Sequence, residues 1–200
     1  MKIAINGFGR IGRVTARLLL QRNDVELVAV NDLTDNRTLA HLFKYDSVHG
    51  VYAGDVSHDE EHLFLNGRTV KAYAAKDPAT LPWKELGIDV VIECTGHFLT
   101  REAASAHLKA GARRIILSAP AKDADIPSVV IGVNDHILKG DDAIISNASC
   151  TTNCAAPMIM GIQQLCGIED GFITTVHSFT GDQRLHDAPH HLMGEPADAL

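Results

Sequence analysis

The chain has 200 residues, 46% of them hydrophobic and 22% charged, with 18 lysines and arginines against 25 aspartates and glutamates. This length and composition predict one or two globular domains with a sizeable core, and they exclude wholesale disorder. The net charge of −7, with no long run of like charges, argues against a nucleic-acid-binding surface and a polybasic membrane anchor. We therefore expect no nucleic-acid partner and no membrane partner.

The N-terminus and the cysteines indicate the compartment. The first six residues lead directly into a glycine-rich segment, which is unlike a secretory signal, and no apolar run approaches the roughly 20 residues that cross a bilayer. Four cysteines are too few and too unevenly spaced for a disulfide framework in a chain of this length. We expect reduced thiols and a cytoplasmic protein.

Short β-branched runs alternate with amphipathic stretches in the first part of the chain. Residues 3–5 and 25–30 read as buried strands, and the apolar positions over residues 11–19 have helical spacing. A second helix is predicted over residues 36–43. Residues 51–74 are predicted to form hairpin-like strands around the turn at Asn66 and Gly67.

The alternation resumes after residue 88. A helix is predicted over residues 101–110, with Gly111 as its stop signal. The further strands that we predict are residues 89–94, 114–117, 129–133 and 143–146. Repeated strands and helices in this order predict the α/β class, with a Rossmann-type, doubly wound, mostly parallel sheet over residues 1–148.

Residues 149–200 are predicted to begin a second, α+β domain, with the boundary near Asn147. A helix is expected from Ser149 to Cys166, kinked or interrupted at Pro157 because proline lacks the backbone donor. Residues 172–176 read as a strand. We expect this second domain to be incomplete.

The glycine-rich segment over residues 7–12 fits the pattern G-x-G-x-x-G between a predicted strand and a predicted helix. In that context Gly7 permits a sharp turn, Gly9 lets a pyrophosphate approach the backbone, and the helix N-terminus offers free N–H groups. Asp32 lies 20 residues beyond Gly12 at the end of the second strand, where a carboxylate can bind the adenosine ribose. The structural alternative is that these glycines form a tight turn that binds no ligand.

Cys150 lies at the predicted start of a helix, where the dipole and unpaired N–H groups stabilise a thiolate. His177 ends the predicted strand 172–176 and could act as acid and base if the fold pairs it with Cys150. The alternative for a cysteine is a small buried hydrophobic residue, which is the interpretation for Cys94, Cys154 and Cys166. A histidine in such a place is more commonly a satisfied surface residue.

Zinc binding is a further alternative. The candidate ligands are Cys150, Cys154, His177, His186, His190 and His191. Their spacing matches no compact zinc pattern, so we expect no metal site.

Five sequence segments belong together: Asn6-Gly7-Phe8-Gly9-Arg10-Ile11-Gly12-Arg13, Asn31-Asp32, Ser118-Ala119-Pro120, Ser146-Asn147-Ala148-Ser149-Cys150-Thr151-Thr152-Asn153-Cys154 and Thr175-Val176-His177-Ser178. Taken together they resemble one family, phosphorylating glyceraldehyde-3-phosphate dehydrogenase. The segment around the cysteine is the most specific of these. The resemblance runs in order from residue 2 to about residue 190.

The resemblance implies an NAD-dependent enzyme of glycolysis and gluconeogenesis that converts glyceraldehyde 3-phosphate and inorganic phosphate into 1,3-bisphosphoglycerate, and a homotetramer. It implies Cys150 as the nucleophile and His177 as its partner. The residues that it places at NAD are Gly7, Phe8, Gly9, Arg10, Ile11, Asp32, Lys76, Thr95 and Ser118. Those that it places at substrate or phosphate are Ser149, Thr151 and Thr180.

The sequence also departs from the family. Lys76 stands where relatives commonly have an arginine near the adenine, so the charge is kept and a planar stacking group is lost. Family members continue well beyond residue 200, so we expect a truncated chain or one that diverges at its end. Erythrose-4-phosphate dehydrogenase is the alternative enzyme, and a non-catalytic NAD-binding or thiol-redox module is the alternative outside catalysis.

Overall fold

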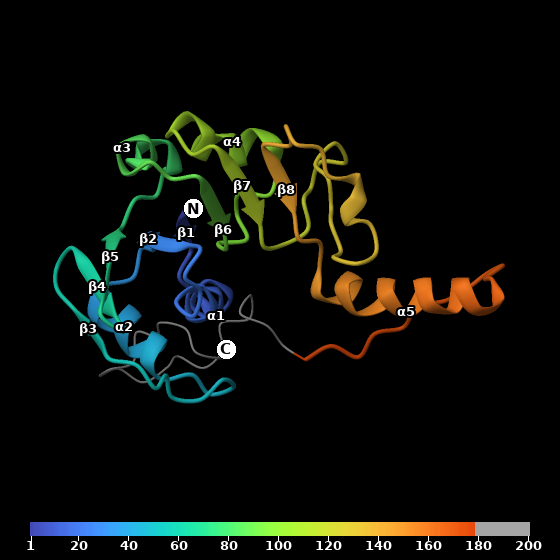
Figure 1. The fold of residues 1–200 in the computed structure, drawn as a ribbon, viewed down its shortest axis with the longest axis horizontal. Helices are drawn as coiled ribbons and strands as arrows, with labels where there is room; N and C mark the ends of the chain where they lie inside the picture. Colours follow the sequence, from blue (N-terminus) through green and yellow to red (C-terminus); the bar gives the residue numbers. More distant parts are fainter. Residues whose placement is uncertain (179–200) are drawn as a thin grey trace, which may run out of the picture.

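The computed structural model describes residues 1–178, which build one eight-stranded sheet in the order β3-β4-β5-β2-β1-β6-β7-β8 (Figure 1). The strands are β1 (Lys2–Asn6), β2 (Glu26–Asn31), β3 (Val56–His58), β4 (His62–Leu65), β5 (Arg68–Tyr73), β6 (Val90–Glu93), β7 (Arg114–Leu117) and β8 (Ile144–Ser146). All neighbours from β5 to β8 pair in parallel, and only β3, β4 and β5 pair antiparallel. The predicted doubly wound, mostly parallel sheet is confirmed.

Three of the five helices in residues 1–178 begin at a capping side chain. The helices are α1 (Arg10–Leu19), α2 (Asn36–Lys44), α3 (Trp83–Leu86), α4 (Arg101–Lys109) and α5 (Cys150–Cys166), with 3₁₀ turns η1 (Pro78–Thr80) and η2 (Asp135–Ile137). The capped helices are α2, α4 and α5. Asp35 caps α2 by accepting from Thr38 N, and Thr100 caps α4 by accepting from Ala103 N. The short elements α3, η1 and η2 have too few residues to show a periodic pattern and were not predicted.

The two faces of the sheet carry separate cores, because successive side chains of a strand point to opposite faces. Ala4 and Val91 contribute to the face that packs on Trp83 of α3 and on α4. Ile5 contributes to the other face, where Phe43 of α2 and the apolar side of α1 cover it. Figure 1 shows α3 and α4 on one side of the sheet and α1 and α2 on the other.

The predicted hairpin forms between β4 and β5. Asn66 and Gly67 both have positive φ angles, of 51° and 76°, as a tight turn with two left-handed residues requires.

Two predicted strands are wrong. Residues 129–133 form no strand: the preceding residue, Ser128, makes an isolated bridge to Ser146, and the backbone then turns at Gly132 with a φ of 79°. The turn forms because Asn134 Oδ1 accepts from Val130 N and Asp135 Oδ1 accepts from Gly132 N, so side chains replace strand partners. Residues 172–176 form no strand, because no other described segment pairs with them.

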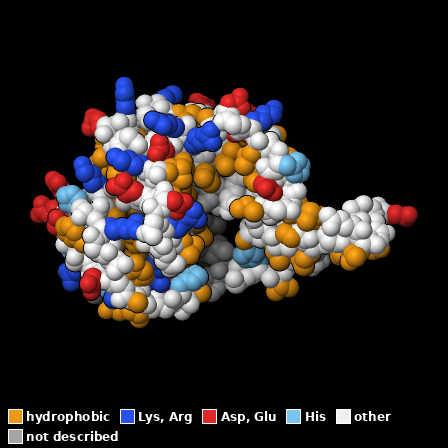
Figure 2. Space-filling model, viewed as in Figure 1, with side chains coloured by type: hydrophobic (Ala, Val, Ile, Leu, Met, Phe, Trp, Pro, Cys, Tyr) orange, Lys and Arg blue, Asp and Glu red, His pale blue; other side chains and the backbone are white. Residues whose placement is uncertain are grey.

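Helix α5 extends away from the sheet, and none of its residues is buried (Figures 1 and 2). It continues through Pro157, so the predicted interruption does not occur. Within residues 1–178, none of the helices has the length and apolar character that a membrane span needs.

Candidate functional site

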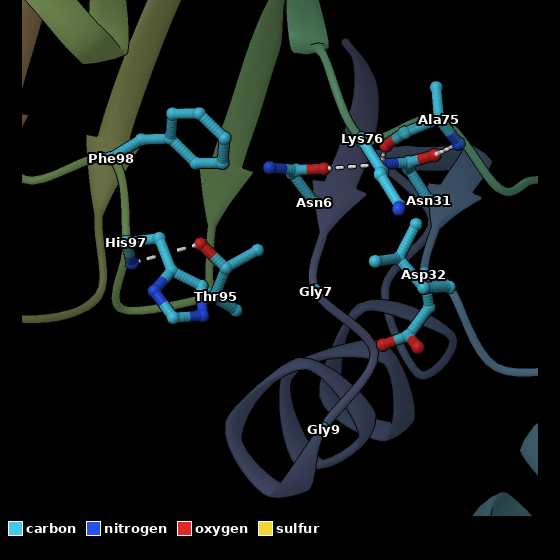
Figure 3. A pocket seen from close by; sticks show the side chains of 12 residues that line it. Asn6, Gly7, Gly9, Asn31, Asp32, Ala75, Lys76, Thr95, His97 and Phe98 are labelled. Atoms are coloured by element: carbon cyan, nitrogen blue, oxygen red, sulfur yellow. Dashed lines mark hydrogen bonds between the residues drawn. The ribbon is translucent and has the colours of Figure 1, made fainter. Parts of the chain in front are cut away.

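A cleft of about 370 Å³ opens at the carboxyl ends of β1, β2 and β6, where the strand order reverses beside β1 (Figure 3). Its lining residues are Asn6, Gly7, Gly9, Asn31, Asp32, Leu33, Ala75, Lys76, Cys94, Thr95, His97 and Phe98. In open parallel sheets, ligands bind at this kind of crevice. We refer to it as the strand-end cleft.

The glycine loop forms the floor of the strand-end cleft. Gly7 has a φ of 90°, and a Cβ there would lie 2.7 Å from Thr95 N. A Cβ on Gly12 would lie 2.1 Å from the carbonyl oxygen of Gly7, so α1 approaches the loop as closely as glycine allows. A Cβ on Gly9 would meet nothing within 4 Å and would instead fill open space at the start of α1. The loop therefore leaves room for a group at the helix N-terminus.

Asp32 joins the loop to the end of β2. Its Oδ2 accepts from Phe8 N at 2.7 Å and its Oδ1 accepts from Thr34 N at 2.9 Å. Each carboxylate oxygen can accept more than one hydrogen bond, so Asp32 keeps acceptor capacity toward the cleft that it lines.

Five of the nine residues predicted at the cofactor line the cleft, and four do not. The five are Gly7, Gly9, Asp32, Lys76 and Thr95. The Phe8 side chain is fully buried and stacks on Phe43. Arg10 lies 3.7 Å from Asp46, and Ile11 is 56% exposed on α1.

Ser118 is the fourth residue outside the lining. It follows β7, donates its backbone N–H to the carbonyl oxygen of Glu93, and hydrogen-bonds Cys94 through its side chain. It therefore supports the cleft through Cys94, which does line it.

Sequence reasoning missed several lining residues. Asn6 and Asn31 end β1 and β2, while His97 and Phe98 follow β6. The available signal was position, because residues at the carboxyl ends of adjacent parallel strands gather at one edge of a sheet. Ala75 likewise follows β5, which runs parallel to β2, but the sequence predicted this segment only as part of a hairpin.

Cys150 and His177 come together at the start of α5, although 27 residues separate them. Cys150 Sγ lies 3.1 Å from His177 Nε2, and His177 Nδ1 donates to the carbonyl oxygen of Ser178 at 2.6 Å. Because that proton occupies Nδ1, Nε2 of the neutral ring is free to accept from the thiol. The pair is solvent-exposed.

The contact between Cys150 and His177 shifts the pKa values of both side chains. The hydrogen bond from His177, helped by the N–H and side chain of Thr151, lowers the pKa of the Cys150 thiol. The same contact with Cys150, helped by the Ser178 carbonyl, raises the pKa of His177. The two shifts favour a thiolate beside an imidazolium.

The neighbours of the pair have separate roles. Ser149 caps α5, with Oγ accepting from Thr152 N at 2.9 Å. Neither Ser149 nor Thr151 lines the strand-end cleft, and the same holds for Cys150 and His177. Thr180 lies outside the described residues.

The remaining cysteines differ in exposure. Cys94 is half-buried, and desolvation raises the pKa of its thiol to about 12. Cys154 and Cys166 are exposed, contrary to the prediction, because α5 buries none of its residues. Within residues 1–178, no three histidine, cysteine or carboxylate side chains come close enough to share a metal ion. His186, His190 and His191 lie beyond those residues.

Comparison with protein families gives two matches. Residues 1–101 match "Glyceraldehyde 3-phosphate dehydrogenase, NAD binding domain", and residues 149–197 match "Glyceraldehyde 3-phosphate dehydrogenase, C-terminal domain". The chain belongs to this family. Its first 101 residues are those of the family's NAD-binding domain.

Similar curated proteins include the glyceraldehyde-3-phosphate dehydrogenases of Thermotoga maritima, 53% identical over 191 residues, and Mycoplasma pneumoniae, 53% identical over 190 residues. The alignments cover 94% and 95% of this chain, but 57% and 56% of those relatives. The enzyme of Clostridium acetobutylicum is 52% identical over 189 residues, 94% of this chain and 56% of that relative. The chain therefore spans somewhat more than half the length of these family members.

The strand-end cleft has the features that NAD binding requires. The open side of Gly9 at the start of α1 is a cradle that a Cβ would fill, and helix N-termini attract pyrophosphate groups. Asp32 supplies acceptors for ribose hydroxyls, and Lys76 extends into the cleft opposite Thr95 (Figure 3). The residues present fit a dinucleotide.

Proposed function

We propose that the protein is a phosphorylating glyceraldehyde-3-phosphate dehydrogenase, which oxidises glyceraldehyde 3-phosphate with NAD and inorganic phosphate. The observation that carries the proposal is the 3.1 Å contact between Cys150 Sγ and His177 Nε2 at a helix N-terminus. A thiolate of lowered pKa is the nucleophile that covalent aldehyde oxidation needs. Family membership supports the substrate class.

The cofactor part of the proposal rests on the strand-end cleft, within a domain that we place at residues 1–148. Gly7, Gly9 and the N–H groups that begin α1, at Arg10 and Ile11, would hold the pyrophosphate. Asp32 would bind the adenosine ribose, and Lys76 and Thr95 would line the remainder. When bound, NAD supplies the hydride acceptor.

The chemistry of the chain's own residues follows from the pair. The Cys150 thiolate adds to the aldehyde carbon, which converts the C=O double bond to an oxyanion and forms a hemithioacetal. His177, when protonated, donates its proton to that oxyanion to give the hemithioacetal hydroxyl. It takes the proton back when the hemithioacetal carbon gives up a hydride, for which bound NAD would be the acceptor, and becomes the thioester carbon. A phosphate oxygen then attacks the thioester carbon, the C–S bond breaks, and the acyl phosphate leaves with the Cys150 thiolate regenerated.

The remaining assignments concern phosphate and assembly. Ser149, Thr151 and Thr180 would contact substrate or inorganic phosphate, in a catalytic domain that begins at residue 149. The N-terminus of α5 supports anion binding at Ser149 and Thr151. We also propose a cytoplasmic homotetramer that acts in glycolysis, which sedimentation of the protein and fractionation of cells would test.

The test compares NAD binding with turnover. We expect the 200-residue chain to bind NAD in calorimetry, because the cleft is lined by residues 6–98 alone. We expect its NADH formation with glyceraldehyde 3-phosphate and phosphate to be at least about 100-fold slower than that of a full-length relative. Reacting groups that are misplaced by about 1 Å slow a reaction by roughly that factor. Faster turnover with erythrose 4-phosphate would reassign the substrate.

A non-catalytic NAD-binding module is the second candidate. It is favoured by the observation that Cys150 and His177 do not line the cleft. NAD binding without any aldehyde-dependent NADH formation, in a chain extended to the length of its relatives, would decide for the module.

A further inference from the structure

Glu93, the last residue of β6, is a buried carboxylate to which the proposed reaction gives no role. Its Oε2 accepts from Asn6 Nδ2 at 2.5 Å and from His107 Nε2 at 3.0 Å. Its Oε1 accepts from Thr95 N at 2.7 Å and from Thr95 Oγ1 at 2.5 Å. Among residues 1–178, no lysine or arginine pairs with it. Four donors take the place of a cation in compensating a buried charge.

These donors belong to a longer chain of hydrogen bonds through the interior. On one side, Trp83 Nε1 donates to His107 Nδ1 at 3.0 Å. On the other side, Asn31 Nδ2 donates to Asn6 Oδ1 at 2.7 Å, and Ala75 N donates to Asn31 Oδ1 at 2.8 Å. We call this set of residues the Glu93 network.

The outer ends of the Glu93 network contribute N–H groups, which can only donate, and the carbonyl oxygen of Ala75 in addition accepts from Asn31 Nδ2 at 2.9 Å. An indole N–H at Trp83 and backbone N–H groups at Ala75 and Thr95 have no acceptor character. The amide groups and the imidazole between these ends can each accept on one side and donate on the other. Because Trp83 donates to Nδ1 of His107, the ring proton occupies Nε2 and points to Glu93.

The directions of the bonds through Asn31, Asn6 and His107 are thereby determined. Ala75 N makes Asn31 Oδ1 an acceptor, so Asn31 Nδ2 faces Asn6 Oδ1 and Asn6 Nδ2 faces Glu93. All three branches converge as donors on position 93. Only a group with acceptors on both atoms satisfies them, and among side chains that group is an ionised carboxylate.

Four members of the Glu93 network reach the strand-end cleft. Asn6, Asn31 and Thr95 line it, together with Ala75, the backbone end of one branch. Figure 3 shows Thr95 on one side of the cleft and Asn31 with Ala75 on the other, with Asn6 between them. The single carboxylate thus connects both walls.

We propose that Glu93 is a positioning residue for NAD binding: its ionised carboxylate orients Asn6 and Thr95 and, through Asn31, sets the place of Ala75 and Lys76. The inference rests on the proposed function, because it takes NAD as the ligand of the cleft. It predicts that NAD affinity depends on the charge of the side chain at position 93 and not on the size of that side chain.

The decisive variant is Glu93→Gln, which keeps the shape and replaces one acceptor by a donor. Whichever way the amide turns, its NH₂ group faces N–H donors of Asn6 and His107 or of Thr95. Exchanging the oxygen and nitrogen positions of the Asn6 and Asn31 side-chain amides does not remove the clash between donors. It only moves that clash to the backbone N–H of Ala75. Buried donors left without acceptors are costly, so we expect NAD affinity to fall by about tenfold or more.

The matched control is Glu26→Gln, the same change at an exposed position of β2. NAD dissociation constants come from calorimetry on the full 200-residue chain, and Trp83, the sole tryptophan, supplies an emission spectrum of the network without ligand. We expect both affinity and emission to change in Glu93→Gln and neither in Glu26→Gln. Wild-type affinity in folded Glu93→Gln would overturn the proposal, even with lowered stability, because the role would then be structural only.

A second pair of variants applies if Glu93→Gln does not fold. His107 does not line the cleft, so its effect on NAD would pass through Glu93. His107→Gln keeps one acceptor and one donor, whereas His107→Leu keeps neither. We expect the leucine variant to lose affinity several-fold and the glutamine variant to recover most of it, and equal affinities would overturn the proposal. No NAD binding by the wild-type chain would overturn the proposed function as well.

Discussion

Residues 1–148 and residues 149–178 differ in how their side chains are held. In the first region Trp83, Phe43 and Leu117 are fully buried between the sheet and its helices. In the second region no residue is buried, and Leu165 is 86% and Phe172 96% exposed. Figure 2 shows apolar side chains along the projecting helix. The strand-end cleft therefore belongs to a packed unit. The pair of Cys150 and His177 depends instead on the start of α5 and on the single contact between the two side chains.

The cysteines show the chemical result of this difference. Burial raises the pKa of Cys94 to about 12, which makes its thiol inert. Exposure keeps the desolvation of Cys150 small, so the imidazole of His177 is free to lower the pKa of its thiol. Packing thus suppresses nucleophilicity in the first region, and the open helix start favours it in the second.

The largest expected effect is on alkylation of these two thiols. At pH 7 a pKa of about 12 leaves a thiolate fraction of about 10⁻⁵, whereas a pKa below the ordinary value leaves about 10⁻² or more. We expect Cys150 to react at least about 1,000-fold faster than Cys94, measured by peptide mapping after limited alkylation.

His177→Gln sharpens the same measurement. Without the imidazole the pKa of Cys150 rises, so its alkylation slows at neutral pH and approaches the wild-type rate only above about pH 9. Cys154, exposed on the same helix, is the internal control. Faster labelling of Cys154 than of Cys150 would contradict the assignment of the nucleophile.

Truncation of leucines tests the packing contrast directly. Leu117→Ala removes a fully buried side chain of β7 and should lower the free energy of unfolding by about 2–5 kcal/mol. Leu165→Ala on α5 should change it by less than about 0.5 kcal/mol. Urea unfolding measures both, and a comparable loss at Leu165 would mean that α5 is packed in solution.

Replacing two helical glycines by alanine should change the stability of the protein in opposite directions. Gly12→Ala places a Cβ 2.1 Å from the carbonyl oxygen of Gly7, so we expect a loss of about 1–3 kcal/mol and weaker NAD binding. Gly161→Ala meets nothing within 4 Å and should stabilise α5 by up to about 1 kcal/mol without affecting NAD. Thermal unfolding measures the stability of both variants, and calorimetry measures their NAD affinity. Unchanged stability and NAD affinity in Gly12→Ala would disprove the close approach of α1 to the glycine loop.

The smallest effect concerns cofactor choice. Asp32 should favour NAD over NADP by about tenfold, because the 2′-phosphate would face a carboxylate and the neighbouring apolar Leu33 offers no donor. Asp32→Ala should narrow this ratio and leave Cys150 alkylation unchanged. Titrations at equal ionic strength provide the check, and equal binding of both cofactors by the wild type would refute the role of Asp32.

Local sequence patterns were enough to predict most elements of the first region. The strand pattern of residues 25–30 and the hairpin turn at Asn66 and Gly67 act over a few residues, so periodicity and turn chemistry reveal them. The glycine spacing from Gly7 to Gly12 likewise predicted the loop of the cleft.

Tertiary structure alone decided which distant groups meet. The wrong strand at residues 129–133 has a local cause instead, because the side chains of Asn134 and Asp135 accept hydrogen bonds from its backbone. The contact of Cys150 with His177 and the convergence of Asn6, Thr95 and His107 on Glu93 join residues that no local pattern relates. Periodicity reports which face of an element is apolar, whereas strand order and helix placement determine the partners of its polar side chains.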